Sequence, residues 1–156
     1  DYFQPNLRIQ SNYLCGISES FTVNFSRSSS LVIAQYFNFL HYGFQGYQKI
    51  IETCITNTIY LSEMLLDTGL FEILSDYKMP VVVFTFREPL LINIEEFTKL
   101  LREKQWMLPY YKLSGEIDIT VMRIVVRNDI KEPFLVQLVD DLVHSYRTLI
   151  TKDEWS

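Results

Sequence analysis

The sequence predicts an α/β protein in which a small sheet carries packed helices and is preceded by long helices. Two β-branched and aromatic runs, 79–86 and 118–127, are typical of buried strands. Segments with helical periodicity follow these runs, at 94–105 and 133–150. A longer helical pattern occupies the chain from residue 30 to residue 69. Helices and strands that alternate in this way favour one compact sheet with helices packed on one face.

The first part of the chain has a weaker pattern. Residues 9–14, followed by Gly16, match one arm of a hairpin. Apolar and polar residues alternate over 21–25, which predicts a short strand. A hairpin and a short strand are therefore expected ahead of the long helices.

Two helices are predicted between Ser30 and Gly69. The helical pattern of the first is interrupted at Gly43 and Gly46, and the second runs from Tyr47 until it ends at Gly69. The apolar face of the first helix consists of Ile33, Phe37 and Leu40, and that of the second of Tyr47, Ile50, Ile51, Cys54, Ile55, Leu61 and Leu65.

Two later helix starts are marked by their first residues. Asn93 is an N-cap residue with Glu96 three positions further on, which is a capping-box pattern. Pro133 stands where proline favours the first helical turn. The tail over 71–156 is therefore expected to run β-α-β-α, with or without one more short strand at its start.

Composition limits the class of protein. The 156 residues are 48% hydrophobic and 21% charged, which is globular, and a single domain or part of a larger one is expected. A net charge of −5 argues against a nucleic-acid surface, and no apolar run approaches the ~18 to 20 residues of a membrane span. Cys15 and Cys54 form neither a disulfide framework nor a metal-ligand pattern, so a reducing, cytoplasmic setting is expected. The first residue is Asp1 rather than Met, which suggests a piece of a longer protein.

A cluster of serines separates the predicted strand at 21–25 from the first helix. Ser26 belongs to the strand side, and Ser28–Ser30 supply candidate N-caps. A helix N-terminus with added hydroxyl donors is suited to an anion such as a phosphate. The alternative is that these serines only cap the helix, and the spacing alone leaves both interpretations open.

Arg123 is the second unusual residue, because it lies inside an apolar strand. The period of two places it on one face with Ile119, Val121 and Val125. A guanidinium in such surroundings needs a partner, and a carboxylate held by two hydrogen bonds matches its planar fork. That carboxylate can belong to a ligand, or to a nearby Asp or Glu in a structural ion pair.

Other polar residues give weaker signals. His41 and His144 have no acid or Cys arrangement around them, so no metal site or catalytic triad is expected. Cys54 is expected in the core. The acids at 95–96 and 140–141 are interpreted as a solvated helix start and a solvated surface.

The serine cluster and Arg123 both occur in motifs of one enzyme family. Asn24-Phe25-Ser26-Arg27, followed by Val32-Ile33-Ala34-Gln35-Tyr36, resembles the N-F-S-R and V-I-A-Q-Y segment of the pyridoxal-phosphate-dependent glutamate decarboxylases, in the group II decarboxylase family. Further matches are Tyr13-Leu14-Cys15-Gly16 with Y-L-G-G, Gly46-Tyr47 with G-Y, Trp106-Met107-Leu108-Pro109 with W-x-V-P, and Val121-Met122-Arg123-Ile124 with V-[ML]-R-[IV]. These matches occur in the family's order over nearly the whole chain.

The resemblance implies a role for each matched residue. The chain would be the C-terminal part of a fold-type-I enzyme, with Ser26 and Phe25 at the phosphate of pyridoxal 5'-phosphate in the neighbouring subunit's site. Arg123 would hold the substrate α-carboxylate, and Tyr13 and Leu14 would belong to a flap hairpin. The implied domains are 1–27, the end of the cofactor-binding domain with the flap; 28–70, linker helices; and 71–156, a small α/β domain.

The resemblance also implies what the whole protein does. It would decarboxylate L-glutamate to 4-aminobutanoate as a homo-oligomer with shared sites. The family's Schiff-base lysine would lie before residue 1, so this chain alone would hold no catalytic residue and be inactive. Cys15 replaces a glycine and Ser28 a proline of the family pattern. Two alternatives stay open: another group II amino-acid decarboxylase, or a non-catalytic paralogue with a role in assembly.

Overall fold

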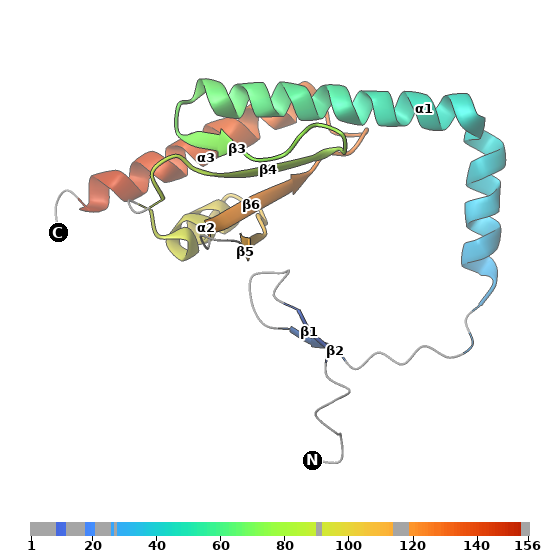
Figure 1. Cartoon of the computed structure of the whole chain (residues 1–156), viewed down its shortest axis with the longest axis horizontal. Coiled ribbons are helices and arrows are strands. Elements are labelled where there is room, and N and C mark those ends of the chain that lie inside the picture. The colour runs from blue at the N-terminus through green and yellow to red at the C-terminus, as the bar shows by residue number, and fades with distance from the viewer. Residues whose placement is uncertain are drawn as a thin grey trace, which may run out of the picture.

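The computed structural model describes residues 9–11, 18–20, 26, 28–89, 92–113 and 119–153. Its elements in chain order are β1 (Ile9–Ser11), β2 (Ser18–Ser20), α1 (Ser30–Asp67), β3 (Phe71–Ile73), β4 (Val81–Phe86), α2 (Ile94–Glu103), β5 (Tyr110–Leu113), β6 (Ile119–Val125) and α3 (Glu132–Asp153) (Figure 1). The antiparallel pairing of β1 with β2 confirms the hairpin expected there, within its described residues. The short strand predicted at 21–25 lies outside the described residues.

Four antiparallel strands form the main sheet, in the order β3-β4-β6-β5. The two runs predicted as strands are its central pair, β4 and β6, with Phe84 opposite Met122 and Val83 opposite Arg123. β3 is the short strand at the start of the tail whose presence the sequence pattern left open. β5 was not predicted, because four residues are too few to show a period of two. Pairing with β6 is what makes this segment a strand.

The core lies between one face of this sheet and the helices. On this face Val82 and Phe84 of β4 and Met122 of β6 are fully buried. They pack with Phe97 of α2 and Leu142 of α3, which are also fully buried. Aromatic rings meet edge to face in this layer, with the Phe86 and Phe97 ring centroids 4.9 Å apart. The prediction that both later helices cover one face of a small sheet is therefore confirmed.

The second half of α1 belongs to the same core. Leu61 and Leu65 are fully buried against the sheet. Asn57 Nδ2 donates to the Ile130 carbonyl at 3.1 Å, and the Tyr60 hydroxyl donates to Glu132 Oε1 at 3.0 Å. These bonds join α1 to the start of α3, so this part of α1 is fixed to the α/β unit.

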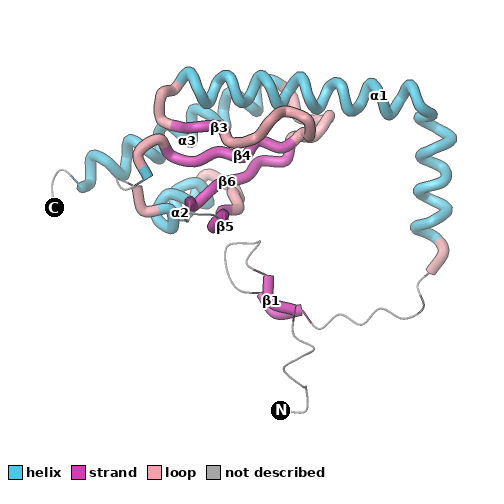
Figure 2. The backbone as a smooth tube through the Cα atoms, in the orientation of Figure 1, coloured by secondary structure: helices cyan, strands magenta, loops and turns pink. Residues whose placement is uncertain are grey.

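α1 bends sharply part-way along, so that its two segments lie at a steep angle to each other (Figures 1 and 2). The bend is at Gly43, whose φ of 57° and ψ of −171° are backbone values found almost only in glycine. Gly46, in contrast, stays helical, which corrects the prediction of an interruption there. A Cβ at Gly46 would lie 2.9 Å from Tyr42 Cβ, so this glycine provides space for a close contact.

The first segment of α1 is exposed on all sides. Every residue from Ser30 to Tyr42 is exposed, including the large apolar ones. The most exposed of these are Leu31, Val32, Ile33, Tyr36, Phe37 and Leu40. Large apolar side chains exposed in such number on one helix are normally covered by protein, so this segment has the composition of an interface.

Candidate functional site

The serine cluster lies where α1 begins. Ser26, Ser28, Ser29 and Ser30 are all exposed. Ser29 is the N-cap residue, but its side chain makes no capping hydrogen bond. The Ser28 hydroxyl instead accepts from the Ser30 N–H at 3.3 Å and donates to the Ser30 hydroxyl at 3.0 Å. The cluster therefore presents exposed hydroxyls at a helix N-terminus, a donor set that suits a phosphate.

Three of the predicted site residues lie outside the described residues: Phe25, Tyr13 and Leu14. Their assigned roles stay predictions. Ser26 and Arg123 are described, and the structure does not bring them together within one chain, because the start of α1 lies far from the sheet that carries Arg123 (Figure 1). The two residues would therefore belong to one site only if two chains contribute to it.

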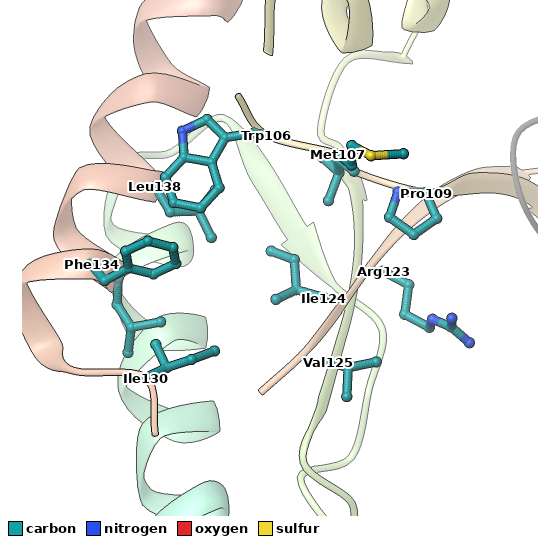
Figure 3. Close-up of a pocket in the computed structure, with 11 residues that line it drawn as sticks. Trp106, Met107, Pro109, Arg123, Ile124, Val125, Ile130, Phe134 and Leu138 are labelled. Carbon is teal, nitrogen blue, oxygen red and sulfur yellow. The ribbon is translucent and has the colours of Figure 1, made fainter. Parts of the chain in front are cut away.

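Arg123 occupies the middle of β6 and points to the sheet face away from the helices. Val83 of β4 lies directly opposite it in the register. Val121 and Val125 share its face, as the period of two predicts, and Val121 is fully buried. Figure 3 shows the neighbouring Ile124 turned toward Phe134 of α3 while Arg123 extends in the opposite direction. The half-buried guanidinium thus stands in an apolar setting, where its attraction for a carboxylate is stronger than in water.

The backbone of Arg123 is held by the segment that precedes β5. The Arg123 N–H donates to the Pro109 carbonyl at 3.1 Å, just before β5 pairs with β6. This segment leaves α2 in a defined direction because α2 ends in a Schellman motif. Gln105 is left-handed with φ of 68°, its N–H donates to the Arg102 carbonyl, and the Trp106 N–H donates to the Leu101 carbonyl.

Asp141 of α3 fixes the start of the same segment. Its Oδ2 accepts from the Trp106 indole N–H at 2.8 Å, and its Oδ1 lies 2.6 Å from Lys104 Nζ. Burial favours the neutral carboxyl, but the hydrogen bonds from Lys104 and Trp106 and the charges of Lys104 and His144 outweigh it and lower the pKa of Asp141. The prediction of a solvated acid pair at 140–141 is therefore wrong for Asp141, whose side chain is only 18% exposed.

Sequence periodicity could not reveal the role of Asp141. It stands beside Asp140, which is exposed, and its partners are more than thirty residues away in the chain. The signal that was available is the helical position itself, since Asp141 lies three residues after the buried Leu138. The acids at 95–96 do lie at an exposed helix start, where Asn93 Oδ1 accepts from both of their N–H groups.

A pocket of about 310 Å³ lies between the segment 106–109, β6 and α3. Arg123 contributes to its lining, and the other lining residues are mostly apolar (Figure 3). The Trp106 and Phe134 rings meet in its wall at 4.7 Å between centroids and an interplanar angle of 65°. The lining residues are Trp106, Met107, Leu108, Pro109, Arg123, Ile124, Val125, Ile130, Phe134, Leu135 and Leu138.

The other residues considered as candidates, Cys54 and His41, have surroundings that fit a structural role. Cys54 is buried in α1, and burial together with the charge of Asp129 raises the pKa of its thiol, as expected for a core cysteine. His41 is exposed and stacks on Phe37 with ring centroids 5.6 Å apart. None of the helices in the described ranges is both long enough and apolar enough to span a bilayer.

Comparison with known proteins identifies the family. The pattern of the pyridoxal-dependent decarboxylase conserved domain matches residues 2–87, more than half of the chain. The chain belongs to the pyridoxal-dependent decarboxylase family. This membership confirms the resemblance found in the motifs.

Named relatives agree with this assignment. The chain is 37% identical over 146 residues to glutamate decarboxylase 2 of Arabidopsis thaliana, covering 90% of this chain and 30% of that protein. It is 33% identical over 150 residues to a probable glutamate decarboxylase gamma of Listeria innocua, covering 91% of this chain and 32% of that protein. This decarboxylase-family chain therefore spans about a third of the length of these relatives.

Solved structures show the same fold. A glutamate decarboxylase from Lactobacillus brevis matches with a TM-score of 0.72 and 29% identity, covering 96% of this chain and 35% of that one. A sphingosine-1-phosphate lyase from Burkholderia pseudomallei matches with a TM-score of 0.64 and 13% identity, covering 95% of this chain and 32% of that one. The second likeness shows the fold alone, and both agree with the predicted fold-type-I architecture.

Proposed function

We propose that this chain forms the carboxy-terminal part of a pyridoxal-phosphate-dependent decarboxylase that converts L-glutamate to 4-aminobutanoate and CO₂. The observation that carries the proposal is the likeness to glutamate decarboxylases at 33–37% identity over most of the chain. A tryptophan decarboxylase from Catharanthus roseus, in contrast, is only 19% identical. The substrate class of the first group is therefore favoured over that of an aromatic amino-acid decarboxylase.

The serine cluster would hold the phosphate of the cofactor. Its exposed hydroxyls at the start of α1 are a suitable donor set, and Ser29 leaves its hydroxyl uncommitted to capping. Pyridoxal phosphate, when bound, withdraws the electrons released as the bond between Cα and the carboxylate breaks. Because the start of α1 lies far from β6, which carries Arg123 (Figure 1), we assign Ser26 to the phosphate of a neighbouring subunit's site.

Arg123 would bind the α-carboxylate of the substrate. Its planar guanidinium accepts a carboxylate through two parallel hydrogen bonds, which fixes the direction of the bond that breaks. The apolar neighbours Val83, Val121 and Val125 on the same sheet face would help to keep water from that bond. A structural ion pair is the competing role for Arg123, and kinetics of Arg123 variants separate the two.

The first segment of α1 supports assembly into a homo-oligomer. Its large apolar residues are exposed on every side, which fits a helix that is covered by other parts of an assembly. Because Ser26 is assigned to the neighbouring subunit's site, each active site would be built from residues of two subunits.

The Schiff-base lysine is proposed to lie in the part of the relatives' length that this chain does not span. Five of the seven lysines have exposed side chains, and Lys104 is held by Asp141. The chain alone is therefore expected to be inactive and to show only nonspecific lysine adducts with pyridoxal phosphate.

The deciding experiment is an assay of the full-length protein for 4-aminobutanoate from glutamate, with and without added cofactor. Aspartate and tyrosine serve as competing substrates. Cofactor-dependent release of 4-aminobutanoate is the expected result. Preference for another amino acid would favour the group II alternative, and failure of every substrate would favour the non-catalytic paralogue.

A further inference from the structure

The contacts of Asp141 form a continuous path from α3 to Arg123. Asp141 accepts from the Trp106 indole at 2.8 Å, Trp106 opens the segment 106–109, and the Pro109 carbonyl at the end of that segment accepts the Arg123 N–H at 3.1 Å. The four residues of this segment therefore connect the helix layer to β6, the strand that carries Arg123.

Both ends of the segment are held, and its middle is partly free. The Trp106 ring is fixed from two sides, by Asp141 and by its edge-to-face contact with Phe134. Leu108 is buried in the core, whereas the side chain of Met107 between them is 87% exposed. The Pro109 carbonyl at the end of this segment gives β6 one hydrogen bond at Arg123, in addition to the pairing of β6 with β4 and β5. The position of the segment therefore influences how the backbone of Arg123 is held.

Both carboxylate oxygens of Asp141 have a partner in the segment that follows α2. One oxygen pairs with Lys104 and the other accepts from Trp106, and the Asp141 carbonyl accepts from the Ser145 hydroxyl at 2.7 Å. A hydrogen bond to an ionised, partly buried carboxylate is among the stronger ones in proteins. An exposed ion pair contributes less to stability. An example is Lys78 with Asp76, whose side chains are 82% and 65% exposed.

We propose that Asp141 and Trp106 are positioning residues for the decarboxylase reaction, acting through Pro109 on the placement of Arg123. This inference rests on the proposed function, in which Arg123 binds the substrate carboxylate. Neither residue touches the substrate. They determine how accurately the guanidinium is presented, and a small misplacement of a binding group has a large effect on rate and affinity.

The test uses the full-length enzyme with Trp106→Phe, which keeps a smaller ring against Phe134 and removes the N–H donor. Asp141→Ala removes the acceptor from the other side. Tyr60→Phe is the matched control, because it also deletes one donor that links two elements, the bond to Glu132 at 3.0 Å, without touching the segment 106–109.

Both test variants should raise the KM for glutamate by roughly tenfold, about the effect of one hydrogen bond to a charged group, with kcat changed less. Tyr60→Phe should leave KM within about twofold. Hydrogen exchange of peptides that cover 119–125 should quicken in Trp106→Phe and not in the control, and this readout does not depend on activity.

An Arg123→Ala background separates positioning from general damage. Trp106→Phe should have less than about a twofold effect on KM there, since residues that act through one another are not additive. An equal effect in both backgrounds, or an unchanged KM in Trp106→Phe, would overturn the positioning role. Normal kcat/KM in Arg123→Ala itself would instead overturn the proposed binding of the substrate carboxylate by Arg123, whatever the Trp106 variant does.

Discussion

Arg123 and the serine cluster have opposite surroundings. Arg123 lies on a central strand beside the buried Val121, and the other face of that sheet is packed against three helices. Ser26 and Ser28–Ser30 are exposed, and the helix they precede stays exposed as far as Tyr42. One proposed binding group therefore stands on a strand whose opposite face forms the core, while the other lies at the exposed N-terminus of an uncovered helix.

This difference separates what one chain can fix from what an assembly must fix. The core of the α/β unit holds the backbone of β6 by pairing on both sides, so the geometry at Arg123 is set within the chain. The first segment of α1 bends away at Gly43, and no other part of the described chain covers it between Ser30 and Tyr42. We expect an assembly that buries this apolar segment to place the serines against their ligand.

The largest expected effect contrasts one phenylalanine from each region. In the 156-residue chain, Phe84→Ala should lower the free energy of unfolding by about 3–5 kcal/mol, because it empties a fully buried site. Phe37→Ala should change it by less than about 0.5 kcal/mol, since this ring is 63% exposed. Urea unfolding measures both. In the full-length assembly the effect of Phe37→Ala should grow, and an equally small effect there would mean that the segment stays uncovered.

Arg123→Ala in the full-length enzyme comes next. The variant should lower kcat/KM by an amount equivalent to about 3 kcal/mol of transition-state stabilisation, because the substrate carboxylate loses its bidentate partner. Cofactor binding should stay nearly intact. Arg123→Lys should restore only part of the loss, since an ammonium lacks the planar fork. Steady-state kinetics beside cofactor titration distinguish the two roles, and near-normal kcat/KM in Arg123→Ala would identify a structural ion pair.

Ser26→Ala should have a smaller effect, and on a different quantity. Ser26 would be one of several donors to the cofactor phosphate, so its loss should weaken cofactor retention by about 1–2 kcal/mol. Cofactor titration of the full-length protein measures this change, with Ser75→Ala as a control serine whose hydroxyl accepts from the Val83 N–H at 3.2 Å. Equal cofactor affinity in Ser26→Ala and the parent would remove Ser26 from the phosphate site.

The smallest effect is the pH dependence of the Asp141 contacts. The pKa of Asp141 is lowered in the folded chain by Lys104, Trp106 and His144 against the effect of burial, so the carboxylate stabilises the fold at pH values above its unfolded pKa of about 3.9. That contribution is lost as the pH falls through the lower, folded pKa. Urea unfolding between about pH 3 and pH 7 should show a steeper loss of stability at acid pH in the parent than in Asp141→Asn. Parallel curves would contradict the lowered pKa.

The sequence by itself determined the features that depend on neighbours in the chain. The β-branched runs specified β4 and β6, the capping pattern at Asn93 specified the start of α2, and a period of two placed Arg123 on one face with Val121 and Val125. Gly43 also ended a helical segment as predicted. Each of these follows from side chains or backbone preferences within a few residues, which is the range over which sequence patterns act.

Only the tertiary structure decided the features that depend on distant partners. β5 is a strand because β6 lies beside it. Asp141 resembles its exposed neighbour Asp140 in sequence, yet it is held by Trp106 and Lys104, 35 and 37 residues away. A carboxylate on a helix surface has no local preference between water and a distant indole, so its role is set by the packing of α3 beside the end of α2.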